Sequence, residues 1–298
     1  MYRLLILLLL ASFALPAAAA AQRQNRRNRR QQRQGQGDDG PQGPAPTISD
    51  LDAIVPKLSS DNPDEVREAI DLLSIIDDPR VIPHLAHVLR SGQPDAITDR
   101  AVEALGGLAN PAAIDVLSAF RHHRRPGVRR RAYQGLAAIR DRRIPGLLER
   151  GLADSDRNVR ATAALALGEI GADGSLDVLF RAFERGVVEA AIAIGKLGNR
   201  QAVARFDEHL GDRPLAIMLS GYNEFLRRRD IPNEVKTEVV ARLGEVSGPM
   251  VRRFLQEFLG TFPTGRRRRT PLQEHVEETL RRIPEGNVGI TLGQEGAQ

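Results

Sequence analysis

The stretch that decides the fold is DSDRNVRATAALALGEIGADGSLDVLFRAF, residues 154–183. Its first half carries small and large apolar side chains at intervals of four and three: Val159, Ala163, Leu167 and Ile170. That spacing is typical of one face of an α-helix. The second half is amphipathic in the same way, and two glycines lie between the halves. The stretch therefore predicts two short helices joined by a turn.

The first of these helices recurs along the chain as EVREAIDLLSII, ITDRAVEALGGL, VRRRAYQGLAAI, VRATAALALGEI and VVEAAIAIGKL. Alignment of the copies gives one column of large apolar residues: Leu73, Leu105, Leu136, Leu167 and Ile194. The spacings are 32, 31, 31 and 27 residues. Four residues earlier every copy has alanine, and three residues later every copy has Ile or Leu. These offsets share one helix face, so each copy is expected to bury one stripe.

Partner helices lie between the copies, as PRVIPHLAHVLR, PAAIDVLSAFR, IPGLLERGL and SLDVLFRAF. A helical pair of this size cannot cover its own apolar stripe, so the pairs must stack. The fold predicted is all-α, an α-solenoid of helical hairpins. Residues 61–64, 92–95 and 154–156 offer N-cap oxygens to the second helices, and Gly106, Gly171 and Gly198 are expected to end them.

The repeat pattern occupies residues 47–211 and then loosens. Residues 212–283 predict divergent helices that cap the stack, over Leu215–Leu226, Val235–Val246, Met250–Leu259 and Leu272–Ile283. Residues 284–298 are Gly-rich and are expected to form a flexible tail.

The N-terminal residues 1–21 have the pattern of a signal peptide. Arg3 precedes the apolar run Leu4 to Leu15, and Ala17–Ala21 offer small residues for cleavage. We therefore expect a periplasmic or secreted protein, without a transmembrane domain if the signal is cleaved. An N-terminally membrane-anchored form is the alternative, because the arginines that follow the apolar run oppose export under the positive-inside rule.

Residues 22–46 carry six Arg against Asp38 and Asp39 and have no aliphatic side chain larger than Ala. Such a segment cannot bury enough surface to fold and predicts a basic disordered arm. The arm suits an anionic surface, and a solubilising tether is the equal alternative. The formal charge of the chain is +5, most of it in this arm, and Trp is absent. A nucleic-acid partner is therefore not favoured.

The stretch from residue 154 resembles the HEAT-like repeat of the bilin-lyase type through its D-x-x-V-R-x-x-A-x-x-A-L-G-x-I-G core. The resemblance covers residues 48–210 and implies an α-solenoid. It says less about function, because such repeats serve scaffolds, adaptors and a few enzymes. It also implies a structural ladder in which arginines after the Val of the core reach an Asp of an adjacent turn: Arg67, Arg129 and Arg160.

A separate set of arginines, Arg121, Arg124, Arg125, Arg129 and Arg130, brackets one turn and is a candidate binding cluster for phosphate or carboxylate. Residues 266–269 form a second cluster. The alternative is a solvated loop that is rich in Arg because the whole chain is. Charge reversal at Arg124 and Arg125 tests the first cluster.

No catalytic set is recognisable in the sequence. There is no Cys, His-Glu dipeptide, G-x-S-x-G, Walker loop or H-E-x-x-H. His84 and His87 share a helix face without a carboxylate or thiolate to complete a metal site, and His122 and His123 point apart. We expect no enzyme, metal or cofactor. The sequence predicts a non-catalytic scaffold or adaptor for a protein partner of unknown identity outside the cytoplasm; the alternative is an arm-assisted binder of an anionic polymer or membrane surface.

Overall fold

The structure is a computed structural model that describes residues 45–263 and 269–284. Its elements there are α-helices and short 3-10 turns, so the predicted all-α fold is confirmed. The chain divides into two compact units, one up to Ala193 and one from Ile194 onward. The predicted signal peptide, all but the last two residues of the arm, and residues 285–298 of the tail lie outside the described residues.

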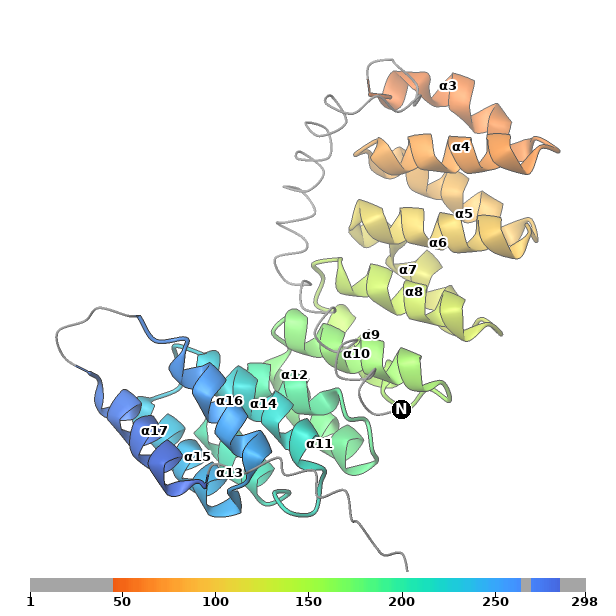
Figure 1. Cartoon of the computed structure of the whole chain (residues 1–298). Helices are drawn as coiled ribbons and strands as arrows, with labels where there is room; N and C mark the ends of the chain where they lie inside the picture. Colours follow the sequence, from red (N-terminus) through yellow and green to blue (C-terminus); the bar gives the residue numbers. More distant parts are fainter. Residues whose placement is uncertain (1–44, 264–268, 285–298) are drawn as a thin grey trace, which may run out of the picture. The chain divides into compact units, whose positions relative to one another are not determined.

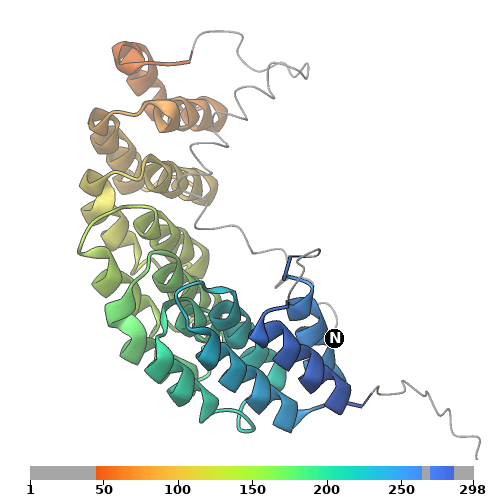
Figure 2. The same cartoon turned by 90° about the vertical axis from the view of Figure 1, so that its left-hand side faces the viewer.

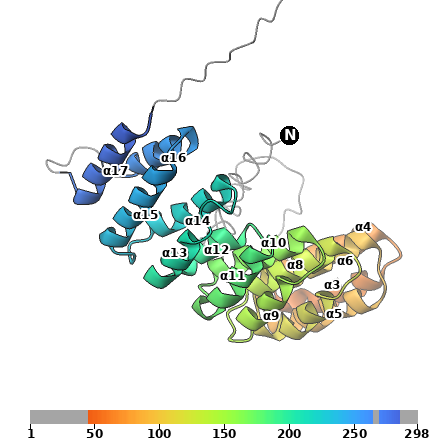
Figure 3. The same cartoon turned by 90° about the horizontal axis from the view of Figure 1, so that it is seen from below.

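The first unit is a stack of helical pairs in two layers (Figures 1 and 3). One layer consists of α5 (Ile82–Arg90), α7 (Ile114–Phe120), α9 (Ile144–Gly151) and α11 (Leu176–Glu184). The other consists of α4 (Pro63–Ile75), α6 (Asp95–Leu108), α8 (Pro126–Ala137) and α10 (Arg157–Glu169). Neighbours in this second layer pack on one another, and the short α3 (Leu51–Ile54) packs on α4. The predicted α-solenoid is therefore confirmed.

The aligned apolar columns form the core. The column alanines and the large residues four positions later are all completely buried: Ala69, Ala101, Ala132, Ala163, Ala190, Leu73, Leu105, Leu136, Leu167 and Ile194. The third column is less uniform, since Ile139 is 2 % exposed whereas Leu108 and Ile170 are half-buried. The invariant stripe is thus the part of each second helix that meets its neighbours.

Two glycines bring α6 and α8 into backbone contact. A Cβ on Gly106 would lie 2.6 Å from the Cα of Gly135, and a Cβ on Gly135 would lie 2.8 Å from the Cα of Gly106. Gly106 was expected to end its helix, and this is wrong, because α6 continues to Leu108 and Ala109 adopts the left-handed conformation instead (φ 51°). Gly171 does follow α10 with φ 72°.

Two of the three expected turns cap their helices with a side chain. Asn62 accepts a hydrogen bond from the N–H of Asp64, and Asp156 accepts from Asn158 and Val159. The N-cap of α6 is Pro94, which supplies no side-chain acceptor. The capping chemistry therefore varies between copies while the helices start at comparable places.

The second unit begins within α12 (Ala190–Leu197), and its described residues contain five further helices (Figures 1 and 2): α13 (Arg200–Asp207), α14 (Leu215–Arg227), α15 (Asn233–Val246), α16 (Pro249–Leu259) and α17 (Pro271–Arg282). The last four begin and end within two residues of the predicted segments. α15 packs on α16 and α17, and α14 packs on α15 and α16. The repeat region is predicted to end at residue 211, whereas the packing divides the chain eighteen residues earlier, inside α12.

An aromatic cluster lies in the core of the second unit. Tyr222 is completely buried, and its ring meets that of Phe206 edge to face at 5.3 Å. Its hydroxyl donates to Oδ1 of Asp207 at 2.5 Å. Burial raises the pKa of the Asp207 carboxyl, although the bond from Tyr222 acts in the opposite direction. Nearby, Arg228 donates to the carbonyl oxygens of Gly195 and Gly198 and so satisfies the end of α12.

Candidate functional site

The turns that lead from the first layer to the second hold the main polar cluster of the first unit. At its centre Arg129 donates from Nε and Nη2 to the two carboxylate oxygens of Asp154, at 2.8 and 2.6 Å. Its Nη1 donates to the carbonyl oxygens of His123 and Arg124, at 3.0 and 3.3 Å. The two side chains are only 11 and 10 % exposed. Arg129 thus joins its own turn to the turn of the next repeat.

This pair is electrostatically strong. Burial by itself raises the pKa of the Asp154 carboxyl, but the hydrogen bonds from the guanidinium of Arg129 and the N–H of Asp156 outweigh it and lower the pKa. The bond to Asp154 raises the pKa of Arg129. Both groups therefore keep their charges.

Other ion pairs join neighbouring second helices. Arg100 of α6 pairs with Asp71 of α4. Asp99 of α6 accepts from Nη2 of Arg125 at 3.1 Å and lies 3.4 Å from Nη1 of Arg131. Because each pair connects successive repeats, these charges stabilise the stack.

The predicted binding cluster is not one open patch of positive charge. Arg125 and Arg129 are held by aspartates, and Arg121 is only 9 % exposed and donates to the carbonyl of Ser118. Arg124 is exposed and 4.0 Å from Asp95. Arg130 is exposed and has no ion pair with any described residue. Of this set, Arg124 and Arg130 are exposed, whereas the other three are buried or half-buried.

The three arginines predicted to form a ladder behave differently. Arg67 departs from the expectation, since it pairs at 2.6 Å with Asp64 of its own helix. The reason is a shift of one residue: Val66 lies seven residues before Leu73, whereas Arg129 lies seven before Leu136. Arg160 has the position of Arg129, and its Nη1 donates to the carbonyl oxygens of Asp154 and Ser155 at 2.8 and 2.9 Å. Of the three, Arg129 reaches an aspartate of the next turn.

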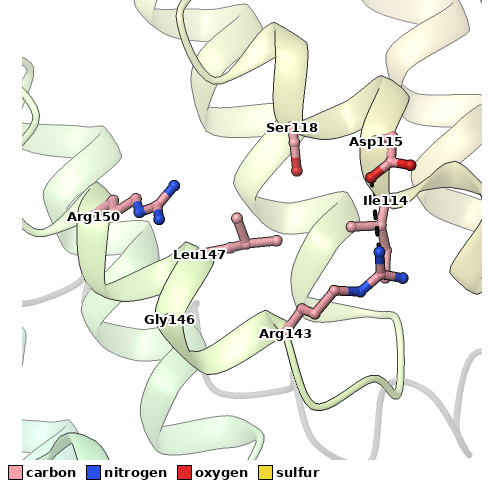
Figure 4. A pocket seen from close by; sticks show the side chains of 7 residues that line it. All are labelled: Ile114, Asp115, Ser118, Arg143, Gly146, Leu147 and Arg150. Atoms are coloured by element: carbon pink, nitrogen blue, oxygen red, sulfur yellow. Dashed lines mark ion pairs between the residues drawn. The ribbon is translucent and has the colours of Figure 1, made fainter.

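Open cavities also occur among the described helices of the first unit, and two of them are considered below. The larger, about 430 Å³, lies between α7 and α9 and is lined by seven residues (Figure 4): Ile114, Asp115, Ser118, Arg143, Gly146, Leu147 and Arg150. Arg143 spans one side to reach Asp115 at 3.7 Å. Ser118 is one of these lining residues, and its buried Oγ has no hydrogen-bond partner among the described residues (Figure 4). A second cavity of about 320 Å³ is lined by Leu152, Ala153, Arg160, Arg185 and Val187.

The histidines of the described residues do not form a metal-binding cluster. His84 and His87 lie on α5, and the described residues contain no group of three or more His, Asp or Glu side chains arranged to hold a metal ion. Burial lowers the pKa of His123, with the positive charges of Arg125 and Arg124 acting in the same direction. Of the second predicted arginine cluster, residues 266–268 lie outside the described part and Arg269 pairs with Glu277.

Within residues 45–263 and 269–284, no helix combines the length and the apolar character needed to cross a membrane.

The solvent-facing positions of the second helices differ from copy to copy. Five residues before the column, the stack carries in order Glu68, Arg100, Arg131 and Thr162. Two residues before it, the stack carries Asp71, Glu103, Gln134 and Leu165. All eight side chains are exposed or half-buried. The face thus changes from charged to uncharged along the stack, while the buried stripe stays the same.

Sequence reasoning identified the arginines but missed their partners. The N-cap interpretation covers Asp95 and Asp154, and Asp99 is not predicted as the partner of an arginine. The available signal was the distance between them: Asp99 and Asp154 lie 26 and 25 residues from Arg125 and Arg129, close to one repeat. Acidic residues one repeat away from an arginine are the pattern that reveals such pairs.

Comparison with known families supports the repeat assignment. A family described as HEAT repeats matches residues 114–189 and, in an overlapping match, residues 144–218. Residues 114–218 therefore contain HEAT repeats. The matches include α7 to α11 and thus the Arg129–Asp154 pair. The predicted resemblance to HEAT-like repeats is confirmed by this match.

Several solved structures are similar to these HEAT repeats. The complex of CpcE and CpcF of phycocyanin lyase from Nostoc sp. PCC7120 is 15% identical over 84% of this chain and 100% of that chain, with a TM-score of 0.44. Human deoxyhypusine hydroxylase is 18% identical over 78% and 96%, with a TM-score of 0.39. A homology model of the AP-3 complex is 14% identical over 78% and 50%, with a TM-score of 0.50. At 14% identity the similarity to the AP-3 model concerns the fold alone. None of the curated proteins matches the chain in sequence.

Proposed function

We propose that this HEAT-repeat protein is a non-catalytic scaffold that binds a protein partner outside the cytoplasm. The observation that carries the proposal is the solvent-facing side of α4, α6, α8 and α10. There, equivalent positions carry a different side chain in each repeat, above a stripe that hardly changes. Such a surface can distinguish one extended partner from another, because each repeat contributes its own contact.

Location outside the cytoplasm is part of the same proposal. It is supported by Arg3, the apolar run Leu4 to Leu15 and the alanines that follow. Mass spectrometry of the mature N-terminus tests it. We expect a chain that begins near Gln22, and a mature chain that still begins at Met1 contradicts the cleaved signal.

The binding face is tested with a photo-crosslinking amino acid placed at Gln134, on the exposed side of α8. His87 on α5, in the other layer, is the matched control position. Crosslinking in the exported fraction should yield one dominant protein adduct from position 134 and not from position 87. Equal adducts from the two positions, or none from position 134, contradict the proposed face.

Binding of an anionic polymer or membrane surface through the arm is the second candidate, because six arginines follow one another closely between Arg23 and Arg33. Ionic strength separates the two functions. Affinity that depends on the arm should fall steeply between about 50 and 200 mM salt. A protein partner held by the second helices should remain bound over that range.

A further inference from the structure

The turn after α11 has a different residue from the turn after α9 at the position equivalent to Asp154. Asp154 follows the buried Leu148 by six residues and accepts from Arg129. Arg185 follows the buried Leu179 by the same six residues. The position that holds a carboxylate in one repeat therefore holds a guanidinium in the next.

The shortened spacing explains why no other acidic residue in this turn replaces Asp154 as the partner of the arginine. From Leu167 to Ile194 the repeat has 27 residues instead of 31, and α12 begins only four residues before its column residue, whereas α10 begins ten residues before Leu167. The Asp-Ser-Asp turn and the first turn of helix seen in α10 have no counterpart there. The turn consists instead of Arg185, Gly186, Val187, Val188 and Glu189.

Arg160 is nevertheless held in the orientation of Arg129. In both residues Nη1 donates to two carbonyl oxygens of the preceding turn. In Arg129 the other edge, Nε and Nη2, grips a carboxylate in bidentate fashion. In Arg160 that edge makes no hydrogen bond to any described residue, and the side chain lines the 320 Å³ cavity together with Arg185. Arg185 is exposed and has no ion pair within residues 45–263 and 269–284.

We propose that Arg160 and Arg185 form a binding site for an aspartate or glutamate side chain of the protein partner. A carboxylate on Arg160 would reproduce the Arg129–Asp154 geometry, and it would also reduce the repulsion between two neighbouring guanidinium groups. Leu152 and Val187 line the same cavity, so a short acidic side chain presented on a turn fits better than a free ion. The site rests on the proposed function, because it assigns one contact of the partner.

A defined peptide tests the site. The probe is an acetylated, amidated peptide with the sequence of residues 152–158, Leu-Ala-Asp-Ser-Asp-Arg-Asn, which copies the turn that Arg129 recognises. Binding is followed by NMR on the Nε–H signal of Arg160 in the full mature chain, with acetate at the same concentration and ionic strength as a comparison. We expect a saturable shift with the peptide and a much smaller one with acetate. An equal response to acetate, or no response to the peptide, overturns the proposal.

Two variants at position 185 sharpen the test. R185D supplies the missing carboxylate within the chain, so it should raise Tm by about 3 °C and weaken the peptide at least about tenfold. R185Q, the neutral control, should leave Tm within about 1 °C and weaken the peptide less. Unchanged peptide affinity in R185D contradicts the site. If R185D no longer binds the peptide but still forms the crosslink at position 134, the carboxylate site is supported as one of several contacts with the partner. If the unsubstituted protein forms no crosslink at position 134, the proposed function is refuted instead.

Discussion

At the scale of single residues, arginine in this protein acts mainly as a structural donor. Arg129 and Arg160 hold turns through carbonyl oxygens, and Arg228 does the same at the end of α12. Five N–H donors in a rigid plane allow one side chain to satisfy a helix end and an aspartate together. Many arginines of the described residues therefore bond to the protein's own backbone and carboxylates, some in buried turns and others at the exposed surface.

The substitution Asp154→Asn tests the best-buried pair. It should lower the free energy of unfolding by about 2 kcal/mol near neutral pH, because Arg129 loses a charged partner in a site that is almost closed to solvent. Denaturant unfolding measures the loss. Asp64→Asn, in the exposed pair with Arg67, is the control and should change stability by less than about 0.5 kcal/mol.

The Arg129–Asp154 pair also predicts that the stability of the protein depends on pH. The pKa of Asp154 lies below its ordinary value of 3.8 in the folded chain, so its contribution is present above pH 3.8 and is lost as the pH falls through the folded value. The stability difference between the unsubstituted protein and Asp154→Asn should therefore shrink in acid. A difference that stays constant down to pH 2 would show that the charge of Asp154 is not its source.

Which arginines would find partners could be predicted only in part. The motif locates Arg129, Arg160 and the Val before them, but Arg67 follows a Val as well and lies one position farther round its helix. A step of one residue turns a side chain by about 100°, which is enough to direct it from the neighbouring turn to solvent. Register against the buried leucine column decides the partner, and a local motif does not carry that information.

At the scale of helices, the contact between α6 and α8 depends on the absence of side chains. The alanine columns were predicted to allow close packing, and they are buried as expected. Gly106 and Gly135 also bring the backbones of α6 and α8 into direct contact. A glycine near a helix end resembles a terminator in the sequence, and only the neighbouring helix shows that it serves packing.

The substitution Gly106→Ala should cost about 2 kcal/mol, since the new methyl group would be forced against the backbone of Gly135. Gly146→Ala on α9 is the matched control. A Cβ there meets nothing within 4 Å, and alanine favours the helix, so stability should stay the same or rise by up to about 1 kcal/mol. Equal losses in both variants would mean that the glycine contact does not determine the spacing.

At the scale of the whole molecule, each repeat of the first unit meets mainly its neighbours. Packing in the second layer runs from α4 to α6, α8 and α10 in order. Stability in such a stack is the sum of local terms and nearest-neighbour terms. The repeat columns predict this organisation well, whereas the division at Ala193 was not evident, because the periodicity continues through the column residue Ile194.

Hydrogen exchange can measure this locality. Leu136→Ala removes a completely buried side chain from α8 and should cost about 3 kcal/mol. Exchange should accelerate in α6, α8 and α10 and change little in α4. Leu73→Ala, an equal truncation in α4, should instead affect α4 and α6 and spare α10. Uniform acceleration in either variant would contradict nearest-neighbour stability.

The buried tyrosines give each unit its own optical reporter. The chain has no Trp and three Tyr, and Tyr133 is 3 % exposed in the first unit while Tyr222 is completely buried in the second. The third, Tyr2, falls within the predicted signal peptide. In a mature chain without that segment, the Y133F variant keeps only Tyr222, so its near-ultraviolet tyrosine signal would report on the second unit. The Y222F variant keeps only Tyr133, so its signal would report on the first unit. The unfolding of the two units could then be followed separately without any attached dye.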